Sequence, residues 1–212
     1  MTQLNKLRIA KLKKDYMRKG TIMVPFEKNE NPLSNEDFSK LKKYCNEVNK
    51  EFIRIGDAGE KNHLLVGRFM TDKDKPRVVK NQFSKKVISI LQKKEIIEFI
   101  KKILGIKRKL YLRRIQFNQI KKGCFVGYHL DVDSNPDYIA ACVIQLGTKF
   151  TGGIYRVYKK NKKKFFDYPP TKGSLIISNC HYPHEVTKVK SGKRGSLVFF
   201  VSYDNGLNKK YI

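Results

Sequence analysis

Several features that would place this chain in a common class are scarce or missing. Only four cysteines occur in 212 residues, Cys45, Cys124, Cys142 and Cys180, and no two of them form a CxxC pair. This argues against a disulfide framework and predicts reduced thiols. No apolar run reaches the 18 residues that suggest a membrane-spanning helix. The N-terminal residues contain no apolar segment typical of a secretory signal, so we expect a cytoplasmic protein.

Acidic residues are also few. Lys and Arg number 46 against 19 Asp and Glu, which gives a formal net charge of +27. Such a charge suits an anionic partner such as nucleic acid or an acidic membrane surface. However, 36 of the basic residues are Lys and 10 are Arg, whereas a phosphate-reading surface would often carry more Arg, which binds phosphate bidentately. Lys is spread along most of the chain, so we favour codon bias as the source of the charge.

The first half of the chain has mainly helical signals. Apolar residues make up 40% of the sequence, with 13 Phe and 11 Tyr, enough for the packed core of one domain. The patterns predict a basic helix or arm over residues 1–20, a strand over 21–26, a helix capped by Ser34, and a helical region over about 84–104. We expect residues 1–108 to pack on the core that follows and to shape the substrate pocket.

From residue 109 the pattern changes to β-structure. Segments rich in β-branched and aromatic residues, separated by Gly, Pro, Asn and Asp, predict strands over 110–117, 138–146, 154–158, 174–178 and 196–203. Many short strands at regular spacing favour a closed or double-sheet architecture. The expected fold class is therefore mainly β with N-terminal helices (α+β), with a jelly roll over residues 109–212.

Five residues of this second region form a pattern with chemical meaning. Side chains two apart on a strand point to the same face, so His129 and Asp131 could share one metal ion. His184 follows 53 residues after Asp131, and two His with one carboxylate form the facial triad of non-haem iron(II) oxygenases. Arg194 offers a planar fork that matches a carboxylate, and Ser196 could donate a second hydrogen bond from the same face.

Together these motifs resemble the 2-oxoglutarate/iron(II)-dependent dioxygenase superfamily, in its prolyl-4-hydroxylase-like branch. The resemblance covers about half of the chain, from residue 110 to residue 203. It combines a glycine turn before the His-x-Asp motif, a double-glycine hairpin, a strand before the distal histidine, and the segment that carries the arginine. These motifs lie in residues 123–131, 150–154, 173–177 and 184–200.

The resemblance implies a fold, a site and a reaction. The fold would be a cupin-like double-stranded β-helix, with His129, Asp131 and His184 as iron(II) ligands. Arg194 would bind the distal carboxylate of 2-oxoglutarate, with Ser196 beside it. The co-substrates would be 2-oxoglutarate and O2, with ascorbate as an optional reductant. The reaction would hydroxylate a C–H bond and release succinate and CO2. Relatives that halogenate lack the carboxylate, so Asp131 favours hydroxylation.

One position departs from the family pattern. Many relatives carry a Tyr three residues before the glycine turn, where it contacts 2-oxoglutarate, and this chain has Ile120 there. Gln116, Asn118, Tyr128 and Tyr138 are alternative donors, and the sequence does not choose among them.

The distal ligand has two alternatives in the sequence. His181 could replace His184, although Arg194 would then lie at the wrong distance. Cys180, His181 and His184 could form a zinc site, but no cysteine pair at finger spacing accompanies them.

Three further residues, Tyr155, Arg156 and His63, have candidate roles. Tyr155 and Arg156 follow the double glycine and are expected at the mouth of the barrel. Arg156 could bind an anionic substrate group, and we favour a solvated charge instead. His63 is expected to be structural or on the surface.

The leading functional prediction is hydroxylation of a small molecule or a protein side chain. Oxidative demethylation of nucleic acid is an alternative, but the DNA-alkylation-repair relatives carry further arginines after the cofactor-binding one, and Gly195 to Phe200 contains none. A third alternative is a jelly-roll binding module without catalytic activity. The complete triad and Arg194 argue against this alternative. The sequence predicts neither the particular substrate nor the oligomeric state.

Overall fold

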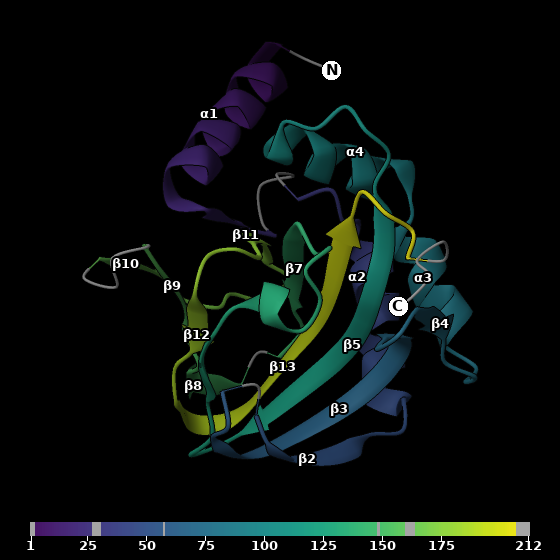
Figure 1. Cartoon of the computed structure of the whole chain (residues 1–212), viewed down its shortest axis with the longest axis vertical. Coiled ribbons are helices and arrows are strands. Elements are labelled where there is room, and N and C mark those ends of the chain that lie inside the picture. Colours follow the sequence, from purple (N-terminus) through teal and green to yellow (C-terminus); the bar gives the residue numbers. More distant parts are fainter. Residues whose placement is uncertain (1–2, 27–30, 57, 148, 160–163, 207–212) are drawn as a thin grey trace.

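Two antiparallel sheets with helices on one side form the computed structural model, which describes residues 3–26, 31–56, 58–147, 149–159 and 164–206 (Figure 1). The elements in chain order are α1 Gln3–Lys19, β1 Thr21–Val24, α2 Asn35–Glu47, β2 Glu51–Ile55, β3 Lys61–Asp72, β4 Pro76–Val78, α3 Ser84–Leu91, α4 Lys94–Leu104, β5 Tyr111–Lys121, β6 Val126–His129, a 3-10 turn Asp131–Asp133, β7 Ala140–Gln145, β8 Phe150–Gly152, β9 Tyr155–Tyr158, β10 Phe165–Tyr168, β11 Leu175–Asn179, β12 His184–Val186 and β13 Val189–Ser202.

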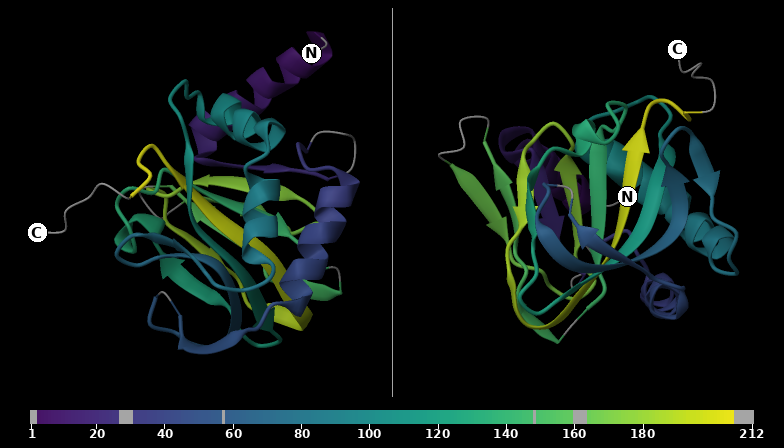
Figure 2. Two further views of the ribbon diagram at one scale, coloured as in Figure 1. Left: turned by 90° about the vertical axis from the view of Figure 1, so that its right-hand side faces the viewer. Right: turned by 60° about the horizontal axis from the view of Figure 1, so that its bottom comes forward.

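The two sheets face each other. The larger sheet has the order β1-β11-β7-β13-β5-β3-β2, with β4 beside β3 and β8 beside β13, and the smaller has the order β10-β9-β12-β6. Val143 and Ile176 of the larger sheet share one buried cluster with Val157 and Val186 of the smaller sheet. Figure 2 shows the smaller sheet standing across from the larger one. This two-layer arrangement confirms the predicted jelly-roll fold class.

The larger sheet has an apolar outer face and a partly polar inner face. In β5, Ile115 and Phe117 belong to the core cluster that includes the helices, while Gln116 lines the space between the sheets. β13 repeats this alternation, with Leu197 on the helical side and Ser196 on the inner side. Because strand side chains alternate between faces, a continuous core on one side leaves the other side free to carry polar groups.

Helices cover the outer face. Leu41 of α2, Val87 of α3 and Ile100 of α4 are fully buried in the core beneath them, and α1 packs beside α4 (Figure 2). Ser34 caps α2 as predicted, because its side chain accepts a hydrogen bond from the backbone N of Asp37 at 3.1 Å. The cap satisfies one of the free N–H groups at the helix start.

The helical region predicted over residues 84–104 is two helices rather than one. α3 ends at Leu91 and α4 begins at Lys94, and Lys93 between them has extended backbone angles of φ −53° and ψ 139°. The ammonium of Lys93 lies 2.7 Å from the carboxylate of Asp37 in α2. Both helices bury their apolar residues in the same core cluster.

The N-terminal half contributes more strands than the sequence pattern predicts. β2 and β3 were not expected, yet β3 pairs with β5 along its length. Gly67 and several charged and amide side chains interrupt β3, so the alternation of apolar and polar residues is weak in its sequence. Backbone pairing with β5 stabilises the strand instead. β1, β2 and β3 thus belong to the same sheet as β5 and β13, and the division at residue 108 stays a prediction.

A buried ion pair joins β5 to the end of β3. The side chain of Arg113 is fully buried, with Nε 2.9 Å and Nη2 3.1 Å from the two carboxylate oxygens of Asp72. Asp72→Ala would leave this guanidinium without its main partner, although Asp137 lies 3.5 Å away. We expect the free energy of unfolding to fall by about 3 kcal/mol, measured by urea denaturation. The exposed neighbour Asp74 is the control, and an equal loss for Asp74→Ala would contradict this role.

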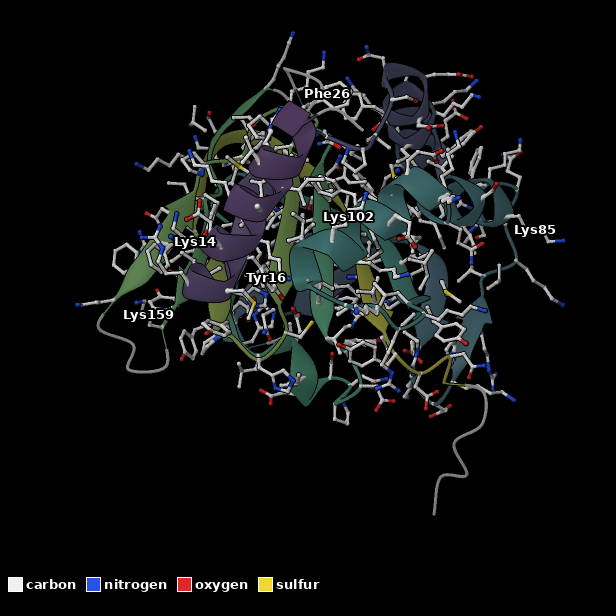
Figure 3. All side chains as sticks on the ribbon, turned by 90° about the horizontal axis from the view of Figure 1, so that it is seen from above. Lys14, Tyr16, Phe26, Lys85, Lys102 and Lys159 are labelled. Atoms are coloured by element: carbon white, nitrogen blue, oxygen red, sulfur yellow. The ribbon has the colours of Figure 1, made fainter. Side chains whose placement is uncertain are left out.

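The positive charge is distributed over the molecule. Figure 3 shows Lys85 of α3 and Lys159 after β9 at opposite edges of one view, with Lys14 and Lys102 between them. No helix in the described part of the chain is long and apolar enough to cross a membrane. The four cysteines are free and buried.

Candidate active site

The His-x-Asp motif lies where β6 ends. His129 is the last residue of β6, and Asp131 begins the 3-10 turn. The expectation that Asp131 lies on the strand is therefore wrong. Leu130 between them keeps extended angles of φ −114° and ψ 133°, so the chain still turns both side chains toward the same cavity. His184 starts β12 and pairs directly with His129 across the smaller sheet.

These three residues converge on one point. Their potential ligand atoms lie within 4.8 Å of one another. Nε2 of His129 is 3.7 Å from one oxygen of Asp131, and Nε2 of His184 is 3.6 Å from the other. Among the described residues this is the only group of three His, Cys, Asp or Glu side chains that could hold a metal ion.

Backbone carbonyls orient both imidazoles. Nδ1 of His129 lies 2.8 Å from the carbonyl oxygen of Gly127, and Nδ1 of His184 lies 3.3 Å from that of Tyr182. A carbonyl oxygen only accepts hydrogen bonds, so each Nδ1 carries a proton. Each Nε2 then faces the space beside Asp131, where it would present its lone pair to a bound metal ion, as metal-binding histidines do.

Asp131 remains a carboxylate although it is buried. Burial alone would raise the pKa of its carboxyl group, but His184 and His129 oppose this effect, and the pKa lies below its usual value. An ionised oxygen ligand is therefore available between two nitrogen ligands at neutral pH. Two neutral imidazoles and one carboxylate are the donor set that suits non-haem iron(II).

Arg194 lies deep in the same cavity. It is 2% exposed, and its Nη1 donates to Ser196 Oγ at 3.1 Å. Nε and Nη2 are buried and have no hydrogen-bond partner among the described residues. Burial lowers the pKa of Arg194 to about 10, so the guanidinium is still charged at neutral pH. A buried, charged fork with two unused nitrogens is suited to an anionic ligand.

The double glycine makes room for this arginine. Gly152 and Gly153 both have positive φ, at +73° and +62°. A Cβ atom on Gly153 would lie 2.8 Å from Cδ of Arg194, and one on Gly152 would lie 2.3 Å from the carbonyl oxygen of Lys188. The hairpin therefore requires glycine at both positions for its backbone angles and for the close approach of β13.

The position of the missing family tyrosine is apolar. Ile120 of β5 is buried directly opposite Arg194 of β13. Tyr155 of β9 lies in the same cavity, with its ring stacked on His184 at a centroid distance of 5.1 Å. No hydrogen bond of its buried hydroxyl within 3.5 Å is found among the described residues, although Ser178 lies near enough to lower the pKa of this hydroxyl. Tyr155 was expected at the mouth, but strand alternation in β9 places it inside.

A cavity of about 230 Å³ connects these groups. Gln116 and Asn118 line it, whereas Tyr128 packs against Tyr158 and Tyr138 stacks on Phe200, outside the lining. The remainder of the wall is largely aliphatic. It is formed in part by Leu64, Ile120, Val126, Val143, Val186 and Val198.

The alternative ligands do not join the cluster. His181 is exposed, and neither His181 nor Cys180 belongs to the group that could hold a metal ion in the described part of the chain. The zinc alternative therefore has no support from the geometry. His63 is exposed beside Phe52, as expected for a surface residue.

Arg156 has a structural partner. Its Nε and Nη2 donate to the two carboxylate oxygens of Asp167 at 2.7 and 2.9 Å, and Glu185 lies 3.7 Å from Nη1. Because it follows Tyr155 on β9, it points to the opposite face and away from the cavity. The proposed substrate contact of Arg156 is therefore not supported.

Comparisons with known proteins agree with this geometry. A model of the 2OG-Fe(II) oxygenase superfamily matches residues 115–202, and no curated protein matches the chain. A solved structure from Burkholderia pseudomallei, described as an oxidoreductase of the 2OG-Fe(II) oxygenase family, is 30% identical. The match covers 96% of this chain and 94% of that one, with a TM-score of 0.88.

Two prolyl hydroxylases are more distant in sequence. The enzyme of Trichoplax adhaerens, solved with a peptide fragment of hypoxia inducible factor, is 14% identical with a TM-score of 0.68, over 98% of this chain and 96% of that one. A Pseudomonas putida prolyl-4-hydroxylase is 15% identical with a TM-score of 0.61, over 92% and 98%. They share the fold, and the Burkholderia match shows more: this chain belongs to the 2OG-Fe(II) oxygenase family, a class of oxidoreductases.

Proposed function

We propose that this protein is an iron(II)- and 2-oxoglutarate-dependent hydroxylase in which His129, Asp131 and His184 hold the metal. Arg194 and Ser196 bind the distal carboxylate of 2-oxoglutarate. One observation carries the proposal: an unpaired, buried guanidinium shares a cavity with two imidazole nitrogens and a carboxylate that converge on one point.

The residues present fit both groups. The donor set of two imidazoles and one carboxylate suits iron(II) and leaves coordination positions for a co-substrate and O2. Nε and Nη2 of Arg194, which lack partners among the described residues, match the two oxygens of a carboxylate. The low polarity around Arg194 makes this pairing stronger than it would be in water.

Each part of the cavity then has a role in the reaction. Iron(II), when bound, supplies the activation of O2. In the proposed reaction, one oxygen atom of O2 would enter the substrate C–H bond, and the other would enter succinate as 2-oxoglutarate loses CO2. Arg194 fixes the co-substrate, the carbonyls of Gly127 and Tyr182 fix the imidazoles, and the aliphatic wall limits access of water. Ascorbate would act only as an auxiliary reductant.

The substrate is proposed to be a small molecule or a protein side chain. The Trichoplax enzyme was solved with a peptide, which makes a peptide one candidate for this chain. Nucleic acid remains the alternative, but the excess of Lys is spread over several elements and is not specific evidence for it (Figure 3).

The function is tested by reconstitution with iron(II), 2-oxoglutarate and O2. We expect slow formation of succinate and CO2 in equal amounts without added substrate, and none when iron(II) is replaced by zinc. If 2-oxoglutarate neither binds the iron-loaded protein nor is converted, the proposal is wrong.

We further propose that Tyr155 supplies the hydroxyl that Ile120 cannot. Burial raises the pKa of Tyr155 well above its usual value, with Asp131 adding to the effect and with Ser178 and Arg194 opposing it. The hydroxyl is therefore a neutral donor within electrostatic reach of Arg194. Tyr155→Phe should weaken 2-oxoglutarate binding about 10-fold, the scale of a hydrogen bond to a charged group.

Tyr158→Phe on the same strand is the matched control. Its hydroxyl donates to Glu185 at 2.7 Å and does not line the cavity. Calorimetric titration of 2-oxoglutarate into anaerobic iron-loaded protein would compare the two variants. Equal dissociation constants for Tyr155→Phe and wild type would remove Tyr155 from the co-substrate site.

A further inference from the structure

A second arginine lies at the other end of the cavity. Arg114 lines it from β5, six residues before Ile120, which faces Arg194. Six residues of strand span roughly 20 Å. Arg114 is half-buried and close to the exposed residues Asp133 and Ser134 of the same lining, whereas Arg194 is buried. Arg114 therefore marks the open end of the cavity, and Arg194 the closed end.

Strand alternation directs Arg114 into the cavity. Arg114 lies two residues before Gln116 and six before Ile120, and all three line the cavity. Residues separated by an even number of positions on a strand share one face. The preceding residue, Arg113, therefore points to the other face of β5, where it forms the buried pair with Asp72.

No ion pair of Arg114 is found in the described part of the chain, although its charge helps to lower the pKa of the Asp131 carboxyl group. Its Nε donates to Oε1 of Gln116 at 2.8 Å, and its guanidinium lies 5.8 Å from the ring centre of Phe200. No hydrogen bond of its two terminal nitrogens is found among the described residues. Two other arginines on strands do form ion pairs: Arg68 pairs with Glu51, and Arg156 pairs with Asp167.

Neighbouring amides hold this arginine in place. Oε1 of Gln116 accepts from Arg114 and from Nη1 of Arg68 at 3.3 Å, and Nε2 of Gln116 donates to Oδ1 of Asn118 at 2.9 Å. A guanidinium fixed through Nε keeps both terminal nitrogens as parallel donors. That geometry is pre-organised for a carboxylate, which a guanidinium binds through two parallel hydrogen bonds.

This inference rests on the proposed function. We propose that the substrate is a small carboxylic acid, free amino acids included, whose carboxylate is bound by Arg114 while its carbon chain reaches the metal ligands. Leu130, Val198 and Ala141 line the same cavity and suit aliphatic carbon. A phosphate would call for more positive charge, and Arg68, the nearest other cation in contact with Gln116, is already paired with Glu51.

The test uses three substrate mixtures with the iron-loaded protein. The first contains the free L-amino acids and aliphatic acids of four to eight carbons, the second contains the same compounds as primary amides, and the third contains peptides capped at both ends. We expect the first mixture alone to raise succinate formation above the substrate-free rate. Equal stimulation by the amides or the capped peptides, or no stimulation by any mixture, would overturn the proposal.

Variants then assign the effect to Arg114. For the active acid, Arg114→Gln should raise KM roughly 10- to 100-fold, the scale of losing hydrogen bonds to a charged group, and Arg114→Lys should give an intermediate value. Arg77→Gln removes one positive charge at an exposed position of β4 and is the control. An unchanged KM in Arg114→Gln, with circular dichroism confirming its fold, would contradict the assignment.

A titration of 2-oxoglutarate in the same wild-type preparation distinguishes a wrong substrate class from a wrong proposed function. If 2-oxoglutarate binds and no acid stimulates its conversion, the assignment of the substrate class fails and the proposed function stands. If 2-oxoglutarate does not bind, the proposed function fails and the substrate assignment fails with it.

Discussion

His129→Ala, Asp131→Ala and His184→Ala should each abolish succinate formation. Within the part of the chain that the structure describes, these three side chains supply all the protein donors at the point where they converge, so the loss of one leaves an incomplete set for iron(II). We expect iron content after anaerobic loading to fall in each variant, measured by colorimetric assay alongside succinate. The fold should persist, because each change removes a cavity-lining side chain and leaves the helical core intact.

His181→Ala is the matched control for this prediction. His181 is exposed and lies three residues before His184 in the sequence, but outside the cluster. This variant should keep its iron and most of its activity. If His181→Ala lost iron while His184→Ala retained it, the ligand assignment would be wrong. In Asp131→Gly, which opens a coordination position for chloride, hydroxylation should fall sharply even if iron still binds.

Arg194→Ala and Arg194→Met should weaken 2-oxoglutarate binding strongly. Removing the partner of a buried carboxylate costs about 2–5 kcal/mol, or roughly 30- to several-thousand-fold in affinity. Arg194→Lys keeps the charge but loses the fork, so its defect should be moderate. The dissociation constant of 2-oxoglutarate would be measured by calorimetry on anaerobic iron-loaded protein.

Two comparisons make the Arg194 prediction specific. Iron affinity should be nearly unchanged, because Arg194 is not among the converging ligands. Pyruvate lacks the distal carboxylate, so it should discriminate little between wild type and Arg194→Ala. An unchanged 2-oxoglutarate titration in Arg194→Ala would remove this residue from the site.

The sequence predicts the parts of the site that depend on spacing. His129, Asp131, His184 and Arg194 follow one another at distances that a two-sheet fold brings together. The glycines beside them reflect local constraints, as Gly153 does against Arg194. The apolar strands of the second half are also visible in the sequence, because they are buried on both faces and therefore rich in β-branched residues.

Features that depend on register are not visible in the sequence. Arg113 and Arg114 are chemically identical neighbours on opposite faces of β5, and only the pairing of β5 in the sheet decides which of them reaches Asp72 and which reaches the cavity. The inward position of Tyr155 depends in the same way on how β9 pairs with β12. β3 was not predicted because it is stabilised by pairing with β5, while its own sequence shows little alternation of apolar and polar residues.

The most direct test of the account is an anaerobic titration of 2-oxoglutarate into the iron(II)-loaded wild-type protein, followed by visible absorption. Chelation of the metal by 2-oxoglutarate should produce a charge-transfer band that saturates at one equivalent per iron. Succinate should produce no such band, and the band should be absent from His184→Ala and require much more 2-oxoglutarate in Arg194→Ala. A wild-type protein that binds iron without developing the band, or a band of full strength in His184→Ala, would contradict the account.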